Sequence, residues 1–266
     1  MDAFVNEADY ALLKQDRYTF AVLDRILRSE CELILSDHVR LILCHSSGTY
    51  PVWIWTPDGI SEAEKDAAWT LAQEVRPLGE GYRYNLKQEL AEHFIKRAAK
   101  TGLNAGISMR LFAYDCPLPM EPAVHADGAA HCCTAEDVRE VSELFPLFYA
   151  EIGEETPSPE SCLEKAREYI GQNAFWLWKN ADGKTVACCS YKCNQGLASL
   201  GSVFTLPDCR RRHYAQNLVY WVTKTVRDKG LIPMLYTDAD YPASNACYEK
   251  IGYRLCGKLC MVAAQK

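Results

Sequence analysis

Apolar residues in the first part of the chain recur at two spacings, one helical and one extended. The helical spacing predicts three helices, over residues 8–28, 61–75 and 86–101. Ser61 and Glu64 form a capping box at the start of the second of them. Short apolar runs predict three strands, over residues 39–44, 50–55 and 107–114. No glycine-rich or arginine-rich turn follows any of these strands, so this part is predicted to lack a phosphate-binding turn.

The rest of the chain continues the alternation in a different order. Helices are predicted to begin at Thr134 and at Ser158, and two more are predicted over residues 214–230 and 242–251. Five strands are predicted, over residues 175–179, 185–193, 199–205, 231–237 and 253–262. The first two of these form a hairpin around Asp182-Gly183. The order is therefore two helices, three antiparallel strands, and then helix, strand, helix and strand.

Prolines at positions 117, 119 and 122 mark the predicted domain boundary, because proline interrupts helices and sheets alike. They divide the chain into residues 1–116 and residues 117–266. The two parts are of similar length and both mix helices with strands, although no sequence repeat relates them. The pattern thus predicts a two-domain α/β (α+β) protein, which is compatible with duplication and divergence.

The stretch from Val203 to Ala215 carries the most specific chemistry. A β-branched and aromatic run meets Pro207, three consecutive arginines follow, and an amphipathic segment begins. This order predicts a strand, a short loop and the first turn of a helix. The N–H groups and dipole at such a helix start favour an anion, and arginines add charge-assisted hydrogen bonds. A solvated basic helix start is the alternative, but positive charge is unfavourable at that end of a helix. The sequence therefore predicts a phosphate site.

Composition restricts the class of protein. The 266 residues are 48% hydrophobic and 24% charged, which is typical of a folded globular protein. A net charge of −6 argues against a nucleic-acid partner, since such proteins need a basic face. The first residues, Met1 to Glu7, have no basic start and no apolar stretch, and no apolar run approaches the ~20 residues of a membrane span. We therefore expect a cytoplasmic protein with no membrane partner.

Thirteen cysteines are scattered along the chain, an odd number without metal-site spacing. The pairs Cys132-Cys133 and Cys188-Cys189 are adjacent, so their side chains point to opposite faces of a strand. Free cysteine behaves as a small buried hydrophobe in a reducing compartment. We expect the cysteines to be structural, with no bound metal.

Two groups of residues carry a resemblance to a known family. They are Thr205-Leu206-Pro207-Asp208-Cys209-Arg210 with Tyr214-Ala215, and Thr237-Asp238-Ala239-Asp240 followed by Asn245, Tyr248-Glu249-Lys250 and Gly252-Tyr253. With the order of elements, they resemble the GNAT (GCN5-related) superfamily of N-acetyltransferases over residues 134–262. In particular, the chain resembles two-domain bacterial predicted acetyltransferases with a glycine N-acyltransferase-like C-terminal half. The resemblance implies tandem GNAT-like domains, each a mixed, mostly antiparallel twisted sheet flanked by helices. It places the acetyl-CoA site in the C-terminal domain.

The phosphate turn departs from the family pattern at one position. The family reads Arg or Gln, two residues, Gly, one residue, and then Gly or Ala. Arg210 and Ala215 match, but His213 stands where the glycine belongs. Glycine allows close backbone approach and unusual φ values, so His213 would narrow the approach or strain the turn. Side-chain contacts from Arg211, Arg212 and His213 would offset that loss.

The resemblance also implies roles for individual residues. The donor contacts would come from Val203, Phe204, Thr205, Arg210, Arg211, Arg212, His213, Tyr214, Ala215 and Asn245. A strand N–H near Val203 would polarise the thioester oxygen. Tyr248 matches the family's general acid, which protonates the leaving thiolate; packing in the core is the alternative reading of this tyrosine. Helix capping is the alternative for Asn245.

The general base has no sequence signal of its own. Asp238 and Asp240 lie at the end of the strand predicted over residues 231–237, which would line the acetyl-CoA cleft. They are the carboxylates nearest to that cleft in sequence, but capping of the next helix is the favoured reading of both. A water chain would serve equally well. The histidines at positions 93, 125 and 131 have no supporting motif and are expected to be structural.

Two hypotheses follow. The first is an N-acetyltransferase that moves an acetyl group from acetyl-CoA directly to a primary amine of a small molecule, as a monomer or homodimer. The second is a catalytically weak acyl-CoA-binding or scaffold protein, favoured by His213 and the degenerate first domain. The presence of Asn245 and Tyr248 favours the first hypothesis, the enzyme. The first domain is expected to bind no cofactor and to wall the acceptor cleft, where Trp53, Trp55 and Tyr84 are candidate contacts whose commoner role is core packing.

Overall fold

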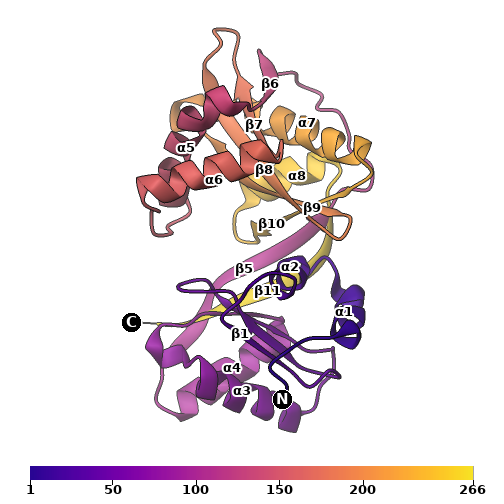
Figure 1. Ribbon diagram of the computed structural model, residues 1–266, viewed down its shortest axis with the longest axis vertical. Coiled ribbons are helices and arrows are strands. Elements are labelled where there is room, and N and C mark those ends of the chain that lie inside the picture. The colour runs from indigo at the N-terminus through magenta and orange to yellow at the C-terminus, as the bar shows by residue number, and fades with distance from the viewer. Residues whose placement is uncertain (266) are drawn as a thin grey trace. The chain divides into compact units, whose positions relative to one another are not determined.

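A computed structural model describes residues 1–265 and divides the chain into two compact units (Figure 1). Unit 1 comprises Met1–Tyr114, Thr237–Pro242 and the chain from Leu255 onward. Unit 2 comprises Asp115–Tyr236 and Ala243–Arg254. The division between Tyr114 and Asp115 lies two residues before the boundary expected from the prolines. It differs from a single cut because the last strand of the chain returns to unit 1.

The sheet of unit 1 is mixed and mostly antiparallel. Its strand order is β1-β2-β3-β4-β11-β5. The strands are β1 (Leu33–Ser36), β2 (Ile42–His45), β3 (Val52–Trp55), β4 (Tyr84–Leu86), β11 (Arg254–Ala264) and β5 (Ala105–Asp115). β1 pairs with β2, β2 with β3 and β11 with β4 in antiparallel fashion, whereas β3 runs parallel to β4.

β3 is apolar at every position, so both of its faces must be covered by other elements. Val52 and Ile54 join the core formed with α3 (Glu62–Val75) and α4 (Gln88–Lys100), and Trp53 on the opposite face meets the Phe20 ring at 6.3 Å. Three further elements precede the sheet: α1 (Glu7–Leu13), a 3₁₀ turn (Lys14–Asp16) and α2 (Ala21–Leu27). A second 3₁₀ turn (Leu78–Glu80) leads into β4. The capping box expected at Ser61 and Glu64 is present.

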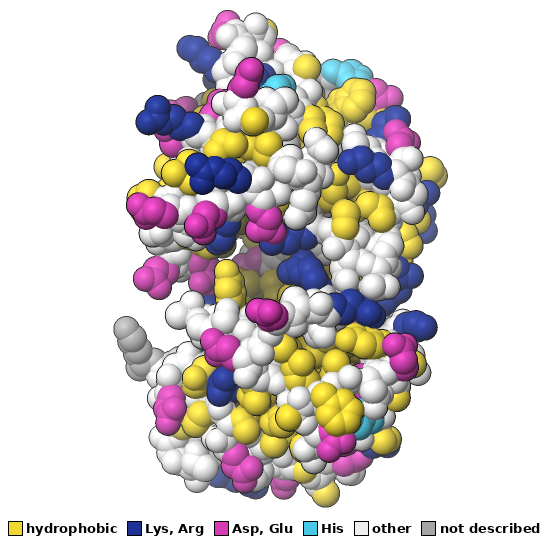
Figure 2. All heavy atoms as spheres, viewed as in Figure 1, with side chains coloured by type: hydrophobic (Ala, Val, Ile, Leu, Met, Phe, Trp, Pro, Cys, Tyr) yellow, Lys and Arg dark blue, Asp and Glu magenta, His cyan; other side chains and the backbone are white. Residues whose placement is uncertain are grey.

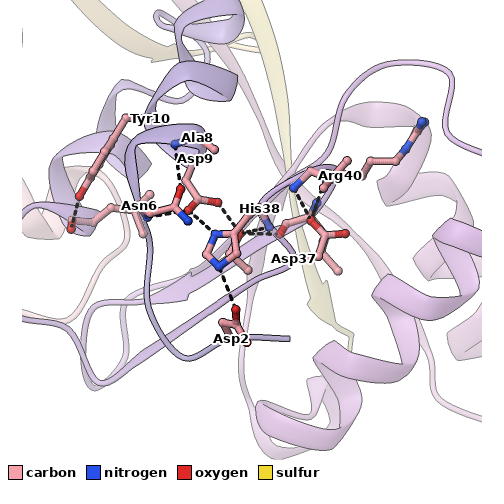
Figure 3. Close-up of polar contacts among 12 residues, drawn as sticks. Asp2, Asn6, Ala8, Asp9, Tyr10, Asp37, His38 and Arg40 are labelled. Carbon is pink, nitrogen blue, oxygen red and sulfur yellow. Dashed lines mark hydrogen bonds and ion pairs between the residues drawn. The ribbon is translucent and has the colours of Figure 1, made fainter.

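A polar cluster fixes the N-terminal segment within unit 1 (Figure 3). The fully buried Asp9 carboxylate accepts hydrogen bonds from the Ser36 hydroxyl and from the Asn6 backbone N–H at 2.8 Å. The His38 ring bonds to Asp9 through Nδ1 at 2.7 Å and to Asp2 through Nε2 at 3.1 Å. The hydrogen bond to Asp9, reinforced by the bond to Asp2, raises the pKa of His38 above its ordinary value.

Unit 2 has a sheet of the same kind. Its order is β10-β9-β8-β7-β6. The strands are β10 (Ile232–Asp238), β9 (Leu197–Thr205), β8 (Thr185–Asn194), β7 (Phe175–Lys179) and β6 (Ala129–Cys132). β10 runs parallel to β9 and the remaining neighbours are antiparallel. The hairpin expected around Asp182-Gly183 joins β7 to β8, with Gly183 at φ +75°.

Helices lie on both faces of this second sheet (Figure 1). α5 (Val138–Glu151) and α6 (Pro159–Gly171) pack on one face around Phe145 and Phe175. On the other side, α7 (Tyr214–Asp228) contacts β7, β8 and β9, and α8 (Pro242–Ile251) precedes Tyr253, whose hydroxyl is 2.7 Å from the Thr223 hydroxyl of α7. Short 3₁₀ turns precede α5 (Ala135–Asp137) and α7 (Pro207–Cys209).

Cys188 belongs to the core beneath α5 and α6. Every cysteine is a free thiol, and burial raises the pKa of Cys188 to about 12. Among residues 1–265, no helix is both long and apolar enough to span a bilayer. Acidic and basic side chains are interspersed over the face of the molecule drawn in Figure 2.

Candidate functional site

The central feature of unit 2 is that its two parallel strands, β9 and β10, separate before they end. β9 and β10 are paired from Leu197 opposite Ile232 to Leu200 opposite Leu235, where the described pairing ends. Both strands continue beyond that point, β9 to Thr205 and β10 to Asp238. Backbone groups of β9 on this side are therefore available to an extended ligand, as in strand addition.

A β-bulge lies at the same place on the opposite side of β9. The register with β8 runs from Ser190 opposite Gly201 to Cys188 opposite Phe204, so two residues of β9, Ser202 and Val203, stand opposite Cys189 alone. Ser202 has φ +48°, the left-handed conformation that such a bulge requires. A bulge interrupts the ladder and turns backbone groups away from it. The N–H near Val203, expected to polarise a thioester, thus lies in irregular backbone.

After β9 the chain forms a short turn that leads into α7. The 3₁₀ turn Pro207–Cys209 follows the strand, and α7 begins at Tyr214. In the part of the chain that the structure describes, no hydrogen bond is donated by the backbone N–H groups of residues 211–216. No acidic residue lies in the first turn of α7 and no side chain caps it. Unpaired N–H groups at a helix start make a site for phosphate oxygens.

The three arginines lie directly before α7, which begins at Tyr214 as predicted. Arg210 is committed to the protein: its Nε donates to the Thr205 carbonyl at 3.2 Å, and its Nη2 forms an ion pair with Glu151 at 2.9 Å. Arg211 and Arg212 are exposed beside the unpaired N–H groups. The helix begins only after the turn because two residues of the turn, Arg211 and His213, have left-handed φ values.

His213 occupies the glycine position of the motif and adopts the conformation that glycine favours. Its φ and ψ are +64° and 6°, and it serves as the N-cap residue of α7. Its ring is exposed, with Nδ1 3.4 Å from the Gln216 side chain. The backbone path of the motif is thus retained without glycine. The substitution is accommodated by strain in the residue itself, since a left-handed conformation costs about 1–2 kcal/mol for a residue with a Cβ.

Asn245 and Tyr248 lie on α8 in the same unit and are both almost fully buried. The Tyr248 ring packs edge-on against Tyr253, with centroids 5.9 Å apart. This contact is the one expected if Tyr248 is a core residue. It also fixes the ring, which a proton donor requires.

Asp238 and Asp240 form a local turn in the part of the chain assigned to unit 1. Asp238 Oδ1 accepts the Asp240 backbone N–H at 2.9 Å, and the Tyr241 N–H donates to the Asp238 carbonyl at 3.2 Å. The Asp240 carboxylate is 3.4 Å from Arg110. Such Asx turns are a structural use of aspartate. The geometry therefore supports the structural reading of Asp238 over that of a base.

Unit 1 contains a corresponding turn between β3 and α3. There too the parallel pairing ends early, with Trp53 opposite Asn85. The start of α3, however, is closed by its own capping box, and Glu62 and Glu64 lie in its first turn. Carboxylates at that position repel a phosphate. The two turns are therefore alike in their place after a parallel strand pair and opposite in charge.

Two groups at the unit 2 turn have no sequence signal. Glu151 is at the end of α5, and Asp127 accepts a hydrogen bond from the Tyr214 hydroxyl at 2.5 Å. Both are distant in sequence from the turn and belong to no local motif, so only the fold brings them to it. Within residues 1–265, no cluster of three or more His, Cys, Asp or Glu side chains is arranged to hold a metal ion.

Comparisons with known proteins agree with this geometry. Residues 138–253 match the model of the acetyltransferase (GNAT) family. No curated protein matches the chain. The solved structure of a GCN5-related N-acetyltransferase from Sphaerobacter thermophilus has a TM-score of 0.69 at 12% identity, covering 99% of this chain and 95% of that one.

Two other solved structures are similar over nearly the whole chain. A GCN5-related N-acetyltransferase from Kribbella flavida has a TM-score of 0.64 at 17% identity and covers 94% of this chain and 95% of its own. A tandem GNAT protein from the clavulanic acid biosynthesis pathway has a TM-score of 0.58 at 14% identity, with 97% and 96% covered. The chain thus has a tandem GNAT fold, and the part of it that matches the acetyltransferase (GNAT) family is residues 138–253.

Proposed function

We propose that this protein is an N-acetyltransferase that uses acetyl-CoA and transfers the acetyl group directly to a primary amine of a small molecule. The observation that carries the proposal is the turn before α7. It offers consecutive N–H groups without partners and exposed guanidinium groups, with no competing acid in the first turn of the helix. A pyrophosphate matches that arrangement of donors and charge. The opening between β9 and β10 next to it suits the amide-containing arm of the same molecule.

Residues of β9 and of the turn before α7 would bind different parts of acetyl-CoA. Backbone groups of Val203, Phe204 and Thr205 would pair with the arm, and the Asn245 side chain would contribute to the same task. The N–H groups of His213, Tyr214 and Ala215 would hold the phosphate oxygens, with Arg211 and Arg212 supplying charge. Arg210 would act indirectly, since its contacts with Glu151 and Thr205 hold the turn in shape.

The transfer requires a proton to leave the amine and another to reach the departing sulfur. As the new C–N bond forms and the C–S bond breaks, the Tyr248 hydroxyl would donate its proton to the thiolate. The N–H near Val203 would stabilise the charge that develops on the carbonyl oxygen. Water, rather than Asp238, would take the proton of the amine, because Asp238 already accepts the Asp240 N–H.

A catalytically weak acyl-CoA-binding protein is the second candidate. The strained His213 favours it, because a side chain at this position narrows the approach to the turn. We propose a cytoplasmic location for either function, supported by thirteen free thiols and no disulfide within residues 1–265.

Calorimetry with acetyl-CoA, followed by thiol release with a panel of small amines, separates these candidates. Acetyl-CoA should bind, and at least one amine should accelerate thiol release. Arg212→Ala should weaken binding about 10-fold, since a charge-assisted hydrogen bond is worth about 1.5–3 kcal/mol before solvent exposure reduces it. Lys224→Ala is the matched control, because it removes an exposed charge of the same helix whose ion pair is with Asp228. Binding without turnover would favour the second candidate, and absence of binding would overturn both.

A further inference from the structure

Residues 117–128, expected to be a linker, pack along unit 2 beside the turn. The Met120 N–H donates to the Ile251 carbonyl at 2.7 Å, and the Asn217 side-chain amide of α7 donates to the Val124 carbonyl at 3.0 Å. Gly252 permits the close passage of this segment, because a Cβ there would lie 2.4 Å from the Leu118 carbonyl oxygen. The 117–128 segment is therefore fixed against the beginning of α7 and the end of α8.

Asp127 is where this segment meets the turn. Its carboxylate accepts the Tyr214 hydroxyl through Oδ1 at 2.5 Å and the Ala181 backbone N–H through Oδ2 at 3.1 Å. Its carbonyl accepts the Trp178 indole N–H at 2.7 Å. One residue thus joins the 117–128 segment, the β7–β8 hairpin and the first residue of α7.

A second contact extends this connection to the anion-binding side. The Arg212 guanidinium lies near the same hydroxyl, and its positive charge lowers the pKa of Tyr214 against the larger effect of Asp127. A hydroxyl donates once and accepts twice, so Tyr214 keeps lone pairs that can accept from a guanidinium while it donates to Asp127. The hydrogen bonds from Tyr214 and Ala181 lower the pKa of Asp127, and the carboxylate raises the pKa of Tyr214. At neutral pH the ionised Asp127 carboxylate therefore holds the Tyr214 hydroxyl, and this relay ends beside the Arg212 guanidinium.

We propose that Asp127 is a positioning residue for the phosphate turn: it holds the Tyr214 hydroxyl and, through it, the Arg212 guanidinium in the geometry that binds an anion. The inference rests on the proposed binding of a coenzyme A thioester at residues 210–215. Tyr214 sits between two residues whose N–H groups face the ligand site. Its fixation orders the donors before the ligand arrives, which removes an ordering cost from binding.

The test is the affinity for CoA, measured by calorimetry at neutral pH well below the melting temperature of each variant. Asp127→Ala and Tyr214→Phe should each weaken CoA binding about 5- to 20-fold, as expected for part of one charge-assisted hydrogen bond. The double variant should bind like the singles, because both changes break the same relay. Asp127→Asn should recover most of the affinity, since its amide oxygen can still accept the Tyr214 hydroxyl. Asp182→Ala, which removes an exposed carboxylate of the same hairpin, should bind within about twofold of wild type.

Each other outcome is decisive. Additive losses in the double variant, or tighter binding by Asp127→Ala, would overturn the positioning role and leave the proposed function standing. A wild-type chain that does not bind CoA would overturn both. If Asp127→Ala does not fold, Tyr214→Phe and Asp127→Asn decide, because each keeps the shape of its side chain. A purely structural role would lower melting temperatures and leave the affinity of the folded protein unchanged.

Discussion

His213→Gly is the most informative single change, because it separates backbone strain from ligand contact. The native residue is held at φ +64° and ψ 6° at the start of α7. A residue with a Cβ loses about 1–2 kcal/mol in this conformation, and glycine loses about 0.5–1 kcal/mol through its freer unfolded chain. The difference predicts a gain in the free energy of unfolding of about 0.5–1 kcal/mol. For a unit of this size the melting temperature should rise by a few degrees.

His213→Ala is the matched control. Alanine removes the imidazole but keeps the Cβ, so it should be no more stable than wild type. The assay is thermal or urea unfolding of the three proteins, followed through unit 2 by the tryptophans of β7, Trp176 and Trp178. Equal stability of the glycine and alanine variants would refute the strain account.

The same variants report on the role of the ring. The imidazole is exposed and contacts only the Gln216 side chain within hydrogen-bond range among residues 1–265. CoA affinity should therefore be equal or better in His213→Gly, since glycine opens the approach to the N–H groups. A large and similar loss in both variants would show that the ring itself binds the phosphate.

Three further predictions concern other parts of the chain. Tyr248→Phe should lower kcat by about 100- to 10,000-fold with little change in acetyl-CoA affinity, because it removes only the proton donor; turnover at the wild-type rate would assign Tyr248 to the core. Calorimetry should give one acetyl-CoA per chain, because the start of α3 is closed by its own carboxylate; a second site would contradict this. His38→Asn should cost more stability at pH 5.5 than at pH 8.5. Bonds to Asp9 and Asp2 raise the folded-state pKa of His38, so its stabilisation is complete below the ordinary value near 6.5 and disappears as the pH rises through the raised pKa. Asparagine tolerates the φ of +60° there, and a pH-independent difference in unfolding midpoints would argue against the imidazolium.

The elements with strong local signals were predictable from the sequence. The Ser61–Glu64 capping box, Ser158 before Pro159 and the Asp182-Gly183 hairpin are all present, since each depends on neighbouring residues alone. The mixed sheets and the tandem GNAT fold were also predicted. Short strands were missed where local signals are weak or compete: β4 is followed almost at once by α4, and the helix predicted over residues 86–101 includes the last residue of β4.

Features that depend on distant contacts had no local signal. The helix predicted over residues 8–28 is interrupted between Leu13 and Ala21, and β3 presents the Trp55 indole to Asp16 of the intervening turn at 2.9 Å. At the turn of residues 210–215, the arginine motif predicts a phosphate site but gives no sign of the side chains that contact the turn. Asp127 and Glu151 reach it only through the fold. Left-handed φ values at Arg211 and His213 were equally invisible, because neither residue type demands them.

The return of β11 to the sheet of unit 1 has a consequence for how the protein is made. This strand is synthesised after the other strands of its sheet, yet it occupies an interior place between β4 and β5. Until β11 has been synthesised, one edge of β4 stays unpaired, although every other strand of the unit 1 sheet has already been made. Exposed edges invite pairing with other chains. A gene truncated near residue 116 should therefore yield an aggregating fragment. Co-expression of residues 254–266 as a separate peptide should reduce that aggregation if the peptide pairs with β4 in place of β11.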